Sequence, residues 1–589
     1  MSHRRAIGLI TTFISGRFFE QIMSGVQEVA WSNQVDILVI HGTPEQVALT
    51  GVGQQRVDGW LVLTYLQGLD LLAQQGKPMV TISCRMPGQT CPAVFPHNRQ
   101  GIESVLEHLL TQGHRRIAFV GDTSIGDIQE RYLAYQEVLA RNNIAFDPEL
   151  VLLTDSPLPD RGALAARRLA AAHNPCTAVV AGNDWTAIGM LREFQEHGYR
   201  IPEDIAIVGF DDIPEAQTTN PPLSTVRQRS DQLGETAARL LIDQIAGKAT
   251  EAVVHYIPTT FVQRESSGSS LLRRINQWKE PEIASGSLWQ TSLSKELVRV
   301  LLPALPPESN PSAAQVWPEV DKLVQLLADT LNEVTDEIDH GKIQLIFSSL
   351  PILNASPEIL VEMLQVLETA GLVLCEQLPE PAPARLQLRA FCDQLSIEMI
   401  RSYRRRQNSS QRTMSEIIQS QYNISQWLSK NPPQQVDWLK ETSTFSGCLG
   451  LWSPSGAEQP PVLSIAGCYQ REGSIALRVG KSYNASQFPP LDWLPSSSEK
   501  NGITTCLVMP VRSADHDWGM LAVSGPLISN DPWLEDNTIN TLEICCGFLG
   551  IALEREVLQE SLRHATENEQ LLSDRLHEIT AHPNQTPTV

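Results

Sequence analysis

The sequence predicts an α/β protein in which residues 4–268 form parallel sheets covered by helices on both faces. Continuous apolar segments such as Ala6–Ile10 and Ile117–Val120 alternate with segments of amphipathic, helical spacing. Strands that are buried on both faces have near-continuous apolar sequences, and the connections between parallel strands are usually helices. After Ser266 this alternation stops, and a longer helical region with Pro-rich breaks follows. We therefore expect one α/β region followed by architecture of a different kind.

The elements of the first region follow one another in a regular order. Strands are expected in the segments RAIGLI, VDILVI, VDGWLVL, KPMVTIS, RRIAFVG, TAVVAGN and DIAIVGF. Helices are expected in the segments FFEQIMSGVQEVAWSNQ, SVLEHLLTQGH, RYLAYQEVLARNN and TAIGMLREFQEHG. Gly113 and Gly198 stand where two of these helices should end, because glycine readily adopts the left-handed conformation of a helix C-cap.

The remaining chain divides into five segments. The sequence SSGSS begins a linker over residues 269–285, and the pattern over 286–435 is helical. Residues 436–552 contain strand-like segments again, 553–580 are predicted to form a coiled coil, and 581–589 are expected to be a disordered tail. Within residues 436–552, CLVMPVR and WGMLAVSG predict an antiparallel hairpin with SADHD as its turn.

The coiled-coil prediction depends on apolar residues that recur in steps of seven, four and three. These residues are Ile551, Leu558, Leu562, Ala565, Leu572, Leu576 and Ile579. Such spacing produces a seam along one helix face and predicts a homodimer. Arg555 and Glu569 occupy two core positions and would weaken the seam.

Composition excludes several classes of function. The net charge of −22 opposes non-specific attraction to nucleic acid. The ten cysteines form no CxxC pair and suggest no zinc site, so we expect reduced thiols, no metal and no cofactor. No segment approaches the length of a membrane helix, which is about 20 apolar residues, and we expect a soluble cytoplasmic protein. No paired carboxylates, nucleophile elbow or P-loop stands out, so the sequence predicts no enzyme activity.

An ordered series of motifs carries a specific resemblance. The motifs are VDGWLVL, HNRQGIESVLEHLLTQGHRRIAFVGD, NDWTAIGML, IPEDIAIVGFDD and PPLSTVRQRSDQLGETAARLLIDQIAGK, and PTTFVQRESSG follows them. In this order and spacing they resemble the ligand-binding domain of the LacI/GalR family, which has a two-lobed periplasmic-binding-protein-like fold. The resemblance covers a little under half of the chain. It implies that a sugar- or nucleoside-like molecule binds between the lobes, where the carboxyl ends of two parallel sheets face each other.

The resemblance also implies the ligand contacts, each just after a strand or at a crossover. These residues are Phe13, Phe18, Ser83, Arg131, Asn183, Trp185, Asp211 and Gln228. The fork of donors on Arg131 suits hydroxyls and carboxylates, Asn183 can donate and accept, and Trp185 could stack on a sugar face.

Each of these residues also has a structural interpretation. Arg131 could form a surface ion pair, and Asn183 could cap the next helix, although Asp184 is the better cap candidate. Asp211 could be a turn residue, a role that suits Asp212 better. Phe18 or the adjacent Phe19 could equally belong to the core.

Two positions depart from the pattern of the family. Ser83 stands where many members have a hydroxyl-binding aspartate, which weakens a generic monosaccharide assignment. His97 replaces the aspartate that usually precedes Asn98, and we interpret it as structural, with a pH-sensitive or hinge role as the alternative.

The sequence before Arg4 is too short for the DNA-binding helices that precede this domain in the family, and no helix-turn-helix is evident elsewhere. We therefore expect DNA binding to be unlikely and the output to pass through a downstream signalling protein. Residues 436–552 resemble a GAF-type sensory domain in their strand pattern and closing helix. In that domain, core packing is the default role for Cys468 and Cys506, and His516 should be exposed.

The favoured function is a cytoplasmic ligand sensor that relays closure of the two lobes to the C-terminal half. The alternative is a LacI-family transcriptional regulator that acts on DNA directly, through the basic stretch Arg401–Arg412, or through a partner. A solvated helix face is the preferred interpretation of that stretch.

Overall fold

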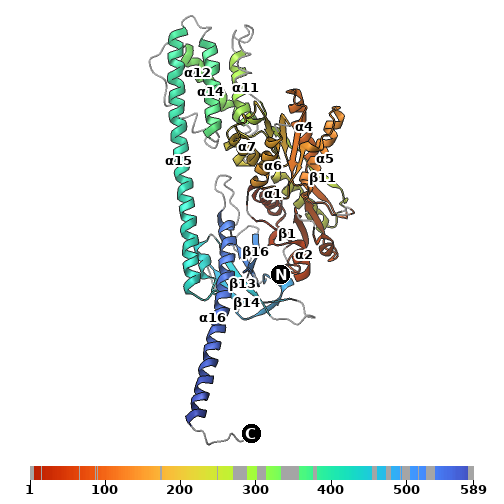
Figure 1. Ribbon diagram of the computed structural model, residues 1–589, viewed down its shortest axis with the longest axis vertical. Coiled ribbons are helices and arrows are strands. Elements are labelled where there is room, and N and C mark those ends of the chain that lie inside the picture. Colours follow the sequence, from red (N-terminus) through yellow and green to blue (C-terminus); the bar gives the residue numbers. More distant parts are fainter. Residues whose placement is uncertain are drawn as a thin grey trace.

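The computed structural model describes two α/β regions and a set of helices between them (Figure 1). The described residues are 5–14, 16–64, 67–86, 88, 90–172, 176–248, 250–268, 288–301, 313–332, 357–375, 381–442, 444–453, 461–471, 479–490, 493, 505–514, 516–525 and 537–581. The predicted linker 269–285 lies outside them, and so does the predicted tail 581–589 except for Ala581, which ends the last helix.

Lobe 1 of the first region is a six-stranded parallel sheet. Its strands, in spatial order, are β2 (Asp36–His41), β1 (Ala6–Thr11), β3 (Gly59–Leu63), β4 (Met79–Ile82), β5 (Ala93–Pro96) and β11 (Val254–Ile257). Its helices are α1 (Arg17–Asn33), α2 (Pro44–Thr50), α3 (Leu69–Ala73) and α9 (Ser230–Ile245). Apolar residues of α1 and α9 share a core with one sheet face, and those of α2 and α3 share a core with the other. This two-sided burial confirms the predicted parallel α/β architecture.

Lobe 2 repeats the same design. Its parallel strands, in spatial order, are β7 (Val151–Leu153), β6 (Ile117–Gly121), β8 (Ala178–Ala181) and β9 (Ala206–Val208). Its helices are α4 (Asn98–Thr111), α5 (Gly126–Arg141), α6 (Pro159–Ala171), α7 (Asp184–Glu196) and α8 (Pro214–Thr218). A separate antiparallel pair, β10 (Thr225–Arg227) and β12 (Thr260–Val262), lies where the chain crosses between the lobes, and η1 (Pro148–Leu150) and η2 (Glu265–Ser267) are short 3-10 turns. Gly113 and Gly198 adopt left-handed conformations after α4 and α7, as predicted.

Helices α1 and α9 cross without room for side chains at their contact. A methyl group on Gly25 would lie 1.9 Å from the carbonyl oxygen of Asp231, and one on Gly234 would lie 2.0 Å from that of Ile22. Real carbon and oxygen atoms do not approach so closely, so the two glycines set the distance between these helices.

We expect Gly25→Ala to destabilise the protein by about 1–3 kcal/mol or more, because the new methyl group forces the two backbones apart. Chemical denaturation of the full chain measures this change. Gly547→Ala is the matched control, since Gly547 is also helical but has no atom within 4 Å of the added methyl group. That control should be neutral or stabilising by up to about 1 kcal/mol. An equal loss of stability in both variants would contradict the proposed close crossing.

The middle of the chain is helical, as predicted. Its described helices are α11 (Leu288–Leu301), α12 (Ala313–Asn332), α14 (Pro357–Cys375) and α15 (Pro381–Lys430). Buried apolar residues from all four form one core. Helix α15 has 50 residues and, at 1.5 Å per residue, extends for about 75 Å, from this bundle down to the second α/β region (Figure 1).

The second region contains five strands, which pair with one another antiparallel, and a long final helix. The strands, in spatial order, are β16 (Thr505–Arg512), β17 (Asp517–Ser524), β13 (Ser446–Trp452), β14 (Val462–Gln470) and β15 (Ser482–Asn484). The final helix is α16 (Asn537–Ala581), and η7 (Asp437–Glu441) and η8 (Ala485–Gln487) are 3-10 turns. Pairing of β16 with β17 confirms the predicted hairpin, and His516 near its turn is exposed. The identification with a GAF-type domain stays a prediction.

Strand β2 of lobe 1 pairs in parallel with β16, which joins both regions into one eleven-stranded sheet. The cores are also continuous, since apolar residues of lobe 1 and of the second region belong to the same two buried clusters. Beside the sheet, the Arg56 guanidinium donates to the carbonyl oxygens of Gln487 and Pro489. Lobe 1 and the second region therefore form one packed unit, which the sequence analysis did not predict.

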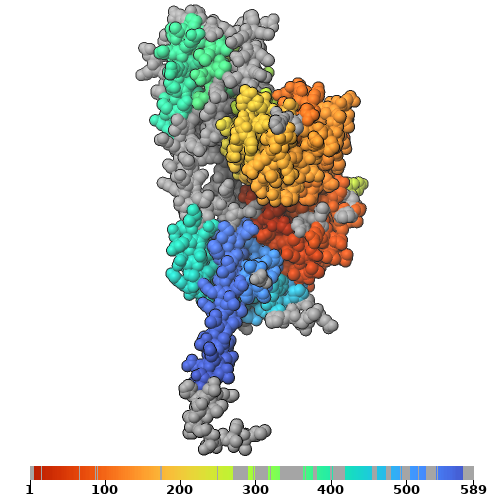
Figure 2. Space-filling view, viewed as in Figure 1, coloured from red at the N-terminus to blue at the C-terminus, as the bar shows by residue number. Residues whose placement is uncertain are grey.

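The far half of α16 extends away from this unit (Figures 1 and 2). Three residues of the predicted seam, Leu558, Leu562 and Leu572, are 58%, 68% and 64% exposed. The side chains of Leu576 and Ile579 lie outside the described set. None of the described helices combines the length and the apolar character that crossing a membrane requires.

Candidate ligand-binding site

Arg131 is the centre of a polar cluster beyond the carboxyl ends of the strands of lobe 2. It lies in the second turn of α5 and is 2% exposed. Its guanidinium donates through Nε to Asn98 Oδ1 at 2.9 Å and through Nη1 to the carbonyl oxygen of Gly182 at 2.7 Å. It also stacks on Phe210, with 3.6 Å between the guanidinium carbon and the ring centroid. The surface ion pair considered as an alternative is therefore wrong, because this arginine is held at the base of the cluster.

Asp211, a second predicted ligand contact, pairs with Arg131. Arg131 Nη1 is 3.3 Å from Asp211 Oδ1, and Gln228 Nε2 donates to the same oxygen at 2.5 Å. The backbone of Asp211 has φ of 118°, and its N–H donates to the carbonyl oxygen of Val226. Such a φ is strained for a residue with a side chain, and strain of this kind is concentrated at functional sites.

The pKa of Asp211 is raised from 3.8 to about 6, because burial disfavours the charged form more than Arg131 and Gln228 favour it. Between about pH 4 and pH 6 the folded state thus binds more protons than the unfolded state at this group. The contribution of Asp211 to stability therefore falls as pH rises through this window.

A ligand hydroxyl that donates to Asp211 forms a stronger hydrogen bond with the ionised carboxylate than with the neutral acid. We therefore expect ligand affinity to increase as pH rises through about 6, and to level off above it. Isothermal titration calorimetry at about pH 5, 6 and 7 measures this dependence. Asp211→Asn removes the titrating group and should show no such rise. A wild-type affinity that is flat across this range would contradict the assignment.

Oε1 of Gln228 is buried beside this cluster and has no hydrogen-bond partner among the described residues. Oγ of Ser83 is buried there too and lies against Asp127, where it acts to lower the pKa of that carboxyl group against the effect of burial. Ser83 follows β4 of lobe 1 and has φ of 56°, whereas Gln228 follows β10 at a crossover between the lobes. Both residues are nine-tenths or more buried. Leaving a buried polar atom unpaired costs about 1–3 kcal/mol, so Gln228 Oε1 is suited to accept a hydrogen bond from a bound molecule.

Three further residues belong to the cluster but were missed by the sequence analysis. Asn98 Nδ2 donates to Asp127 Oδ1 and to Glu130 Oε2, at 3.0 Å each. Burial raises the pKa of both carboxyl groups, against the influence of Arg131 and Asn98. Asp127 and Glu130 precede Arg131 by four residues and one, so helical spacing from Arg131 could have identified Asp127.

Asn183 and Trp185 lie at the start of α7. Asn183 Oδ1 accepts from the Thr186 N–H at 3.0 Å and so caps the helix, which was the alternative role considered for it. The expectation that Asp184 is the better cap is wrong: Asp184 is fully buried and accepts from Thr225 Oγ1 and from the Ile213 N–H. Trp185 is 38% exposed and free to contact a ligand from the rim.

Asp212 is not simply a turn residue. Its backbone has φ of 56°, but its carboxylate is buried between Arg227, at 2.5 Å, and Arg264, at 2.6 Å. These arginines come from β10 and from the segment after β12, where the chain passes between the lobes. This ion-pair cluster leaves no local signal in the sequence, because Asp212, Arg227 and Arg264 come from separate elements of the chain.

The aromatic candidates belong to lobe 1. The rings of Phe13 and Phe18 are 6.2 Å apart, and both are partly buried against the core, whereas Phe19 is fully inside it. His97 caps α4, since its ring nitrogen accepts from the Gln100 N–H, and its ring lies 5.1 Å from that of Tyr256. These contacts agree with the structural interpretation of His97.

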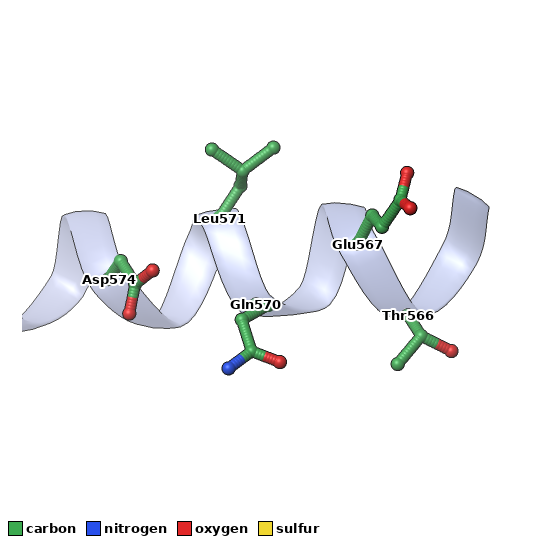
Figure 3. A pocket seen from close by; sticks show the side chains of 5 residues that line it. All are labelled: Thr566, Glu567, Gln570, Leu571 and Asp574. Carbon is green, nitrogen blue, oxygen red and sulfur yellow. The ribbon is translucent and has the colours of Figure 1, made fainter. Parts of the chain in front are cut away.

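A hollow lies on the far half of α16 (Figure 3). Thr566, Glu567, Gln570, Leu571 and Asp574 line it, and all five come from this one exposed helix. A hollow bounded by a single helix does not enclose a ligand, so the inter-lobe cluster is the better candidate. Among the described residues, no group of three or more His, Cys, Asp or Glu side chains could hold a metal ion.

Two parallel-sheet lobes with a polar cluster where the chain crosses between them define a two-lobed, periplasmic-binding-protein-like domain. The family profile described as "Periplasmic binding protein-like domain" matches residues 106–267. The chain is 32% identical over 267 residues to the ribose operon repressor of Halalkalibacterium halodurans. The matched segment covers 44% of this chain and 79% of the repressor. The chain belongs to the LacI family of regulators through this domain.

Other known proteins are also similar to this part of the chain. The HTH-type transcriptional repressor PurR of Pectobacterium carotovorum is 27% identical over 281 residues, covering 45% of this chain and 81% of the repressor. A solved LacI family transcriptional regulator from Mycobacterium smegmatis is 32% identical and covers 44% of this chain and 98% of its own, with a TM-score of 0.40.

Proposed function

We propose that the protein is a ligand-sensing regulator that binds a small polar molecule of the sugar or nucleoside class between its lobes. The observation that carries this proposal is the buried, unpartnered Oε1 of Gln228 beside the Arg131–Asp211 pair, with Ser83 of lobe 1 buried against Asp127 of the same cluster. Donors and acceptors in such an arrangement match the hydroxyl groups of a sugar. The name of the ribose operon repressor supports the same class of ligand.

The test is a thermal melt of the full chain with a panel of sugars, nucleosides and amino acids. A molecule that binds only the folded state raises the melting temperature as its concentration rises above its Kd. We expect one sugar or nucleoside to stabilise the wild type, and to stabilise Asp211→Asn less at the same concentration. The absence of any shift across the panel would count against the proposal.

We further propose that closure of the lobes is relayed to the C-terminal half. Lobe 1 is joined to the second region through β2 and β16, whereas α8 of lobe 2 contacts α14 of the helical bundle. Helix α15 connects this bundle to the second region, so a change in the angle between the lobes must alter either the α8–α14 contact or the position of α15 (Figure 1).

Hydrogen exchange of the full chain tests the relay. Saturating ligand should change the hydrogen exchange of α14 as well as that of the inter-lobe segments. Helix α8 follows Asp211 in the chain and contacts α14, so a change at Asp211 can reach α14 through α8. Exchange changes confined to residues 4–268 would contradict it.

A second candidate function is transcriptional regulation, which the names of the relatives favour. Gel shifts on the upstream region of its own gene, at low and at high salt, test this candidate. Retardation that falls steeply with salt would support DNA contact, for which Arg401–Arg412 on α15 is the densest basic stretch. Of that stretch, only the Arg401 side chain is described, and it is exposed.

We also propose a homodimer through the far half of α16, with no catalytic activity of its own. The exposed Leu558, Leu562 and Leu572 support this assembly, because a heptad seam is stable only when a partner helix covers it. Sedimentation of the wild type and of a Leu558→Glu, Leu562→Glu double variant distinguishes a dimer from a monomer.

A further inference from the structure

Two cysteines of the second region stand directly opposite each other on paired strands. Cys448 of β13 is the register partner of Cys468 of β14 in the antiparallel ladder. Directly opposed residues in such ladders have Cα atoms about 4.5–5.5 Å apart and side chains on the same face. A disulfide requires Cα atoms about 4.4–6.8 Å apart. The backbone therefore holds these two thiols where a bond can form without moving the strands.

The two thiols differ in accessibility. Cys448 is fully buried among the apolar residues of the sheet, whereas Cys468 is only partly buried and lies one strand from the sheet edge at β15. The Cys448 thiol donates a hydrogen bond to Cys468, and this bond lowers the pKa of Cys468. Burial instead raises the pKa of Cys506, Cys545 and Cys546. The register partner of Cys506 is Ser524, and the other two cysteines lie in α16, so none of the three has a thiol opposite it on a paired strand. One thiol is thus reachable from solvent, and a second lies directly behind it.

We propose that Cys468 and Cys448 form a dithiol that responds to peroxide by closing a cross-strand disulfide. The Cys468 thiolate attacks one oxygen of hydrogen peroxide, the O–O bond breaks, and hydroxide leaves, so that Cys468 becomes a sulfenic acid. The Cys448 thiol then attacks the sulfur of the sulfenic acid, the S–S bond forms, and the hydroxyl group leaves with the thiol proton as water. Overall, two thiols and one peroxide give one disulfide and two waters, and a thiol reductant reverses the reaction.

This pair gives the protein a second input that does not depend on the ligand between the lobes. Oxidation ties β14 to β13, and β13 belongs to the sheet that continues through β17 and β16 into lobe 1. The bond closes the segment between the two cysteines into a covalent loop and restricts the unfolded chain. We therefore expect the oxidised protein to melt at a higher temperature than the reduced protein.

The experiment treats the reduced full chain briefly with hydrogen peroxide, blocks free thiols with N-ethylmaleimide, and digests without reductant. No lysine or arginine lies between Lys440 and Arg471, so trypsin releases both cysteines in one peptide. Cleavage after Glu458 then separates them unless a disulfide joins them. We expect a joined peptide that is two hydrogens lighter than its reduced form, carries no maleimide, and separates after reduction.

Cys468→Ser and, separately, Cys448→Ala should abolish the joined peptide, with circular dichroism to verify that each variant folds. In Cys448→Ala, Cys468 should instead carry a trappable sulfenic acid, which a merely structural cysteine would not. Cys392→Ser is the matched control, because Cys392 is also partly buried but its pKa is raised by burial to about 12, and it should behave as the wild type does. Maleimide on both cysteines after peroxide, over-oxidation of Cys468 without a bond, or a bond between Cys468 and Cys506 would each overturn the proposal.

Discussion

Replacing Arg131 with alanine is expected to weaken ligand binding roughly 30-fold or more and to cost the protein about 3 kcal/mol or more of its folding free energy. The guanidinium is the shared donor for Asn98, Gly182 and Asp211, and it is almost fully buried. Removing one partner of a buried ion pair costs about 3–5 kcal/mol, because the other charge stays buried without compensation. In the variant, the Asp211 carboxyl keeps only the bond from Gln228.

The loss of affinity has a separate cause. A ligand that contacts both Arg131 and Asp211 loses its charge-assisted hydrogen bond with the guanidinium in this variant. The Asp211 carboxylate then faces the ligand without the positive charge of Arg131. Truncation of one member of a buried charged pair typically costs about 2–5 kcal/mol, which is roughly 30-fold or more in Kd. Calorimetric titration measures the affinity, and urea denaturation measures the stability.

Two variants separate these effects. Arg131→Lys keeps the positive charge but loses the planar fork of donors. We therefore expect its free energy of unfolding to lie between those of wild type and Arg131→Ala, and its ligand affinity to be weak. Arg200→Ala is the control, because the Arg200 guanidinium is exposed and pairs with Asp204 at the surface. This variant should change neither the ligand affinity nor the stability appreciably. Wild-type affinity in Arg131→Ala would show that the ligand binds elsewhere.

Most of the first α/β region could be predicted because its signals are local. Apolar strands and amphipathic helices each leave a pattern within a few residues, and the glycines at two helix ends need only their own conformation. The motif resemblance added Arg131, Asp211 and Gln228, and the structure brings these three residues together.

The pairing of β2 with β16 had no such signal. The two strands are separated by more than 450 residues, and an uncovered edge strand indicates only that something must cover it, not which segment does so. Asn98 and Asp212 were missed for the same reason. A buried amide between two carboxylates, or a carboxylate between two arginines, is visible only once distant elements are placed side by side.

Asp212→Asn is expected to produce a loss of stability as large as that of any single polar substitution in the described chain. The side chain is 1% exposed and bridges Arg227 and Arg264, which join strand β10 to the segment after β12. Asparagine keeps the shape but removes the charge, so two largely buried arginines face no anion. We expect a cost of about 3–5 kcal/mol in urea denaturation.

The pH dependence of stability distinguishes this mechanism from a packing defect. Burial alone would raise the pKa of Asp212, but Arg264 and Arg227 lower it overall. A carboxyl group with a lowered pKa in the folded state contributes stability above its unfolded pKa of about 3.9, and that contribution is lost as pH falls through the folded value. The difference between wild type and Asp212→Asn should therefore be full near pH 7 and shrink below about pH 4.

Asp204→Asn is the matched control for this experiment. Asp204 also accepts from an arginine, Arg200, but the pair lies at the surface, where solvent screens the charges. Its substitution should leave the denaturation midpoint near pH 7 almost unchanged. If the two variants lost equal stability, burial would not determine the strength of these pairs. If Asp212→Asn alone were severe, the carboxylate between Arg227 and Arg264 would be established as the electrostatic anchor of the crossover between the lobes.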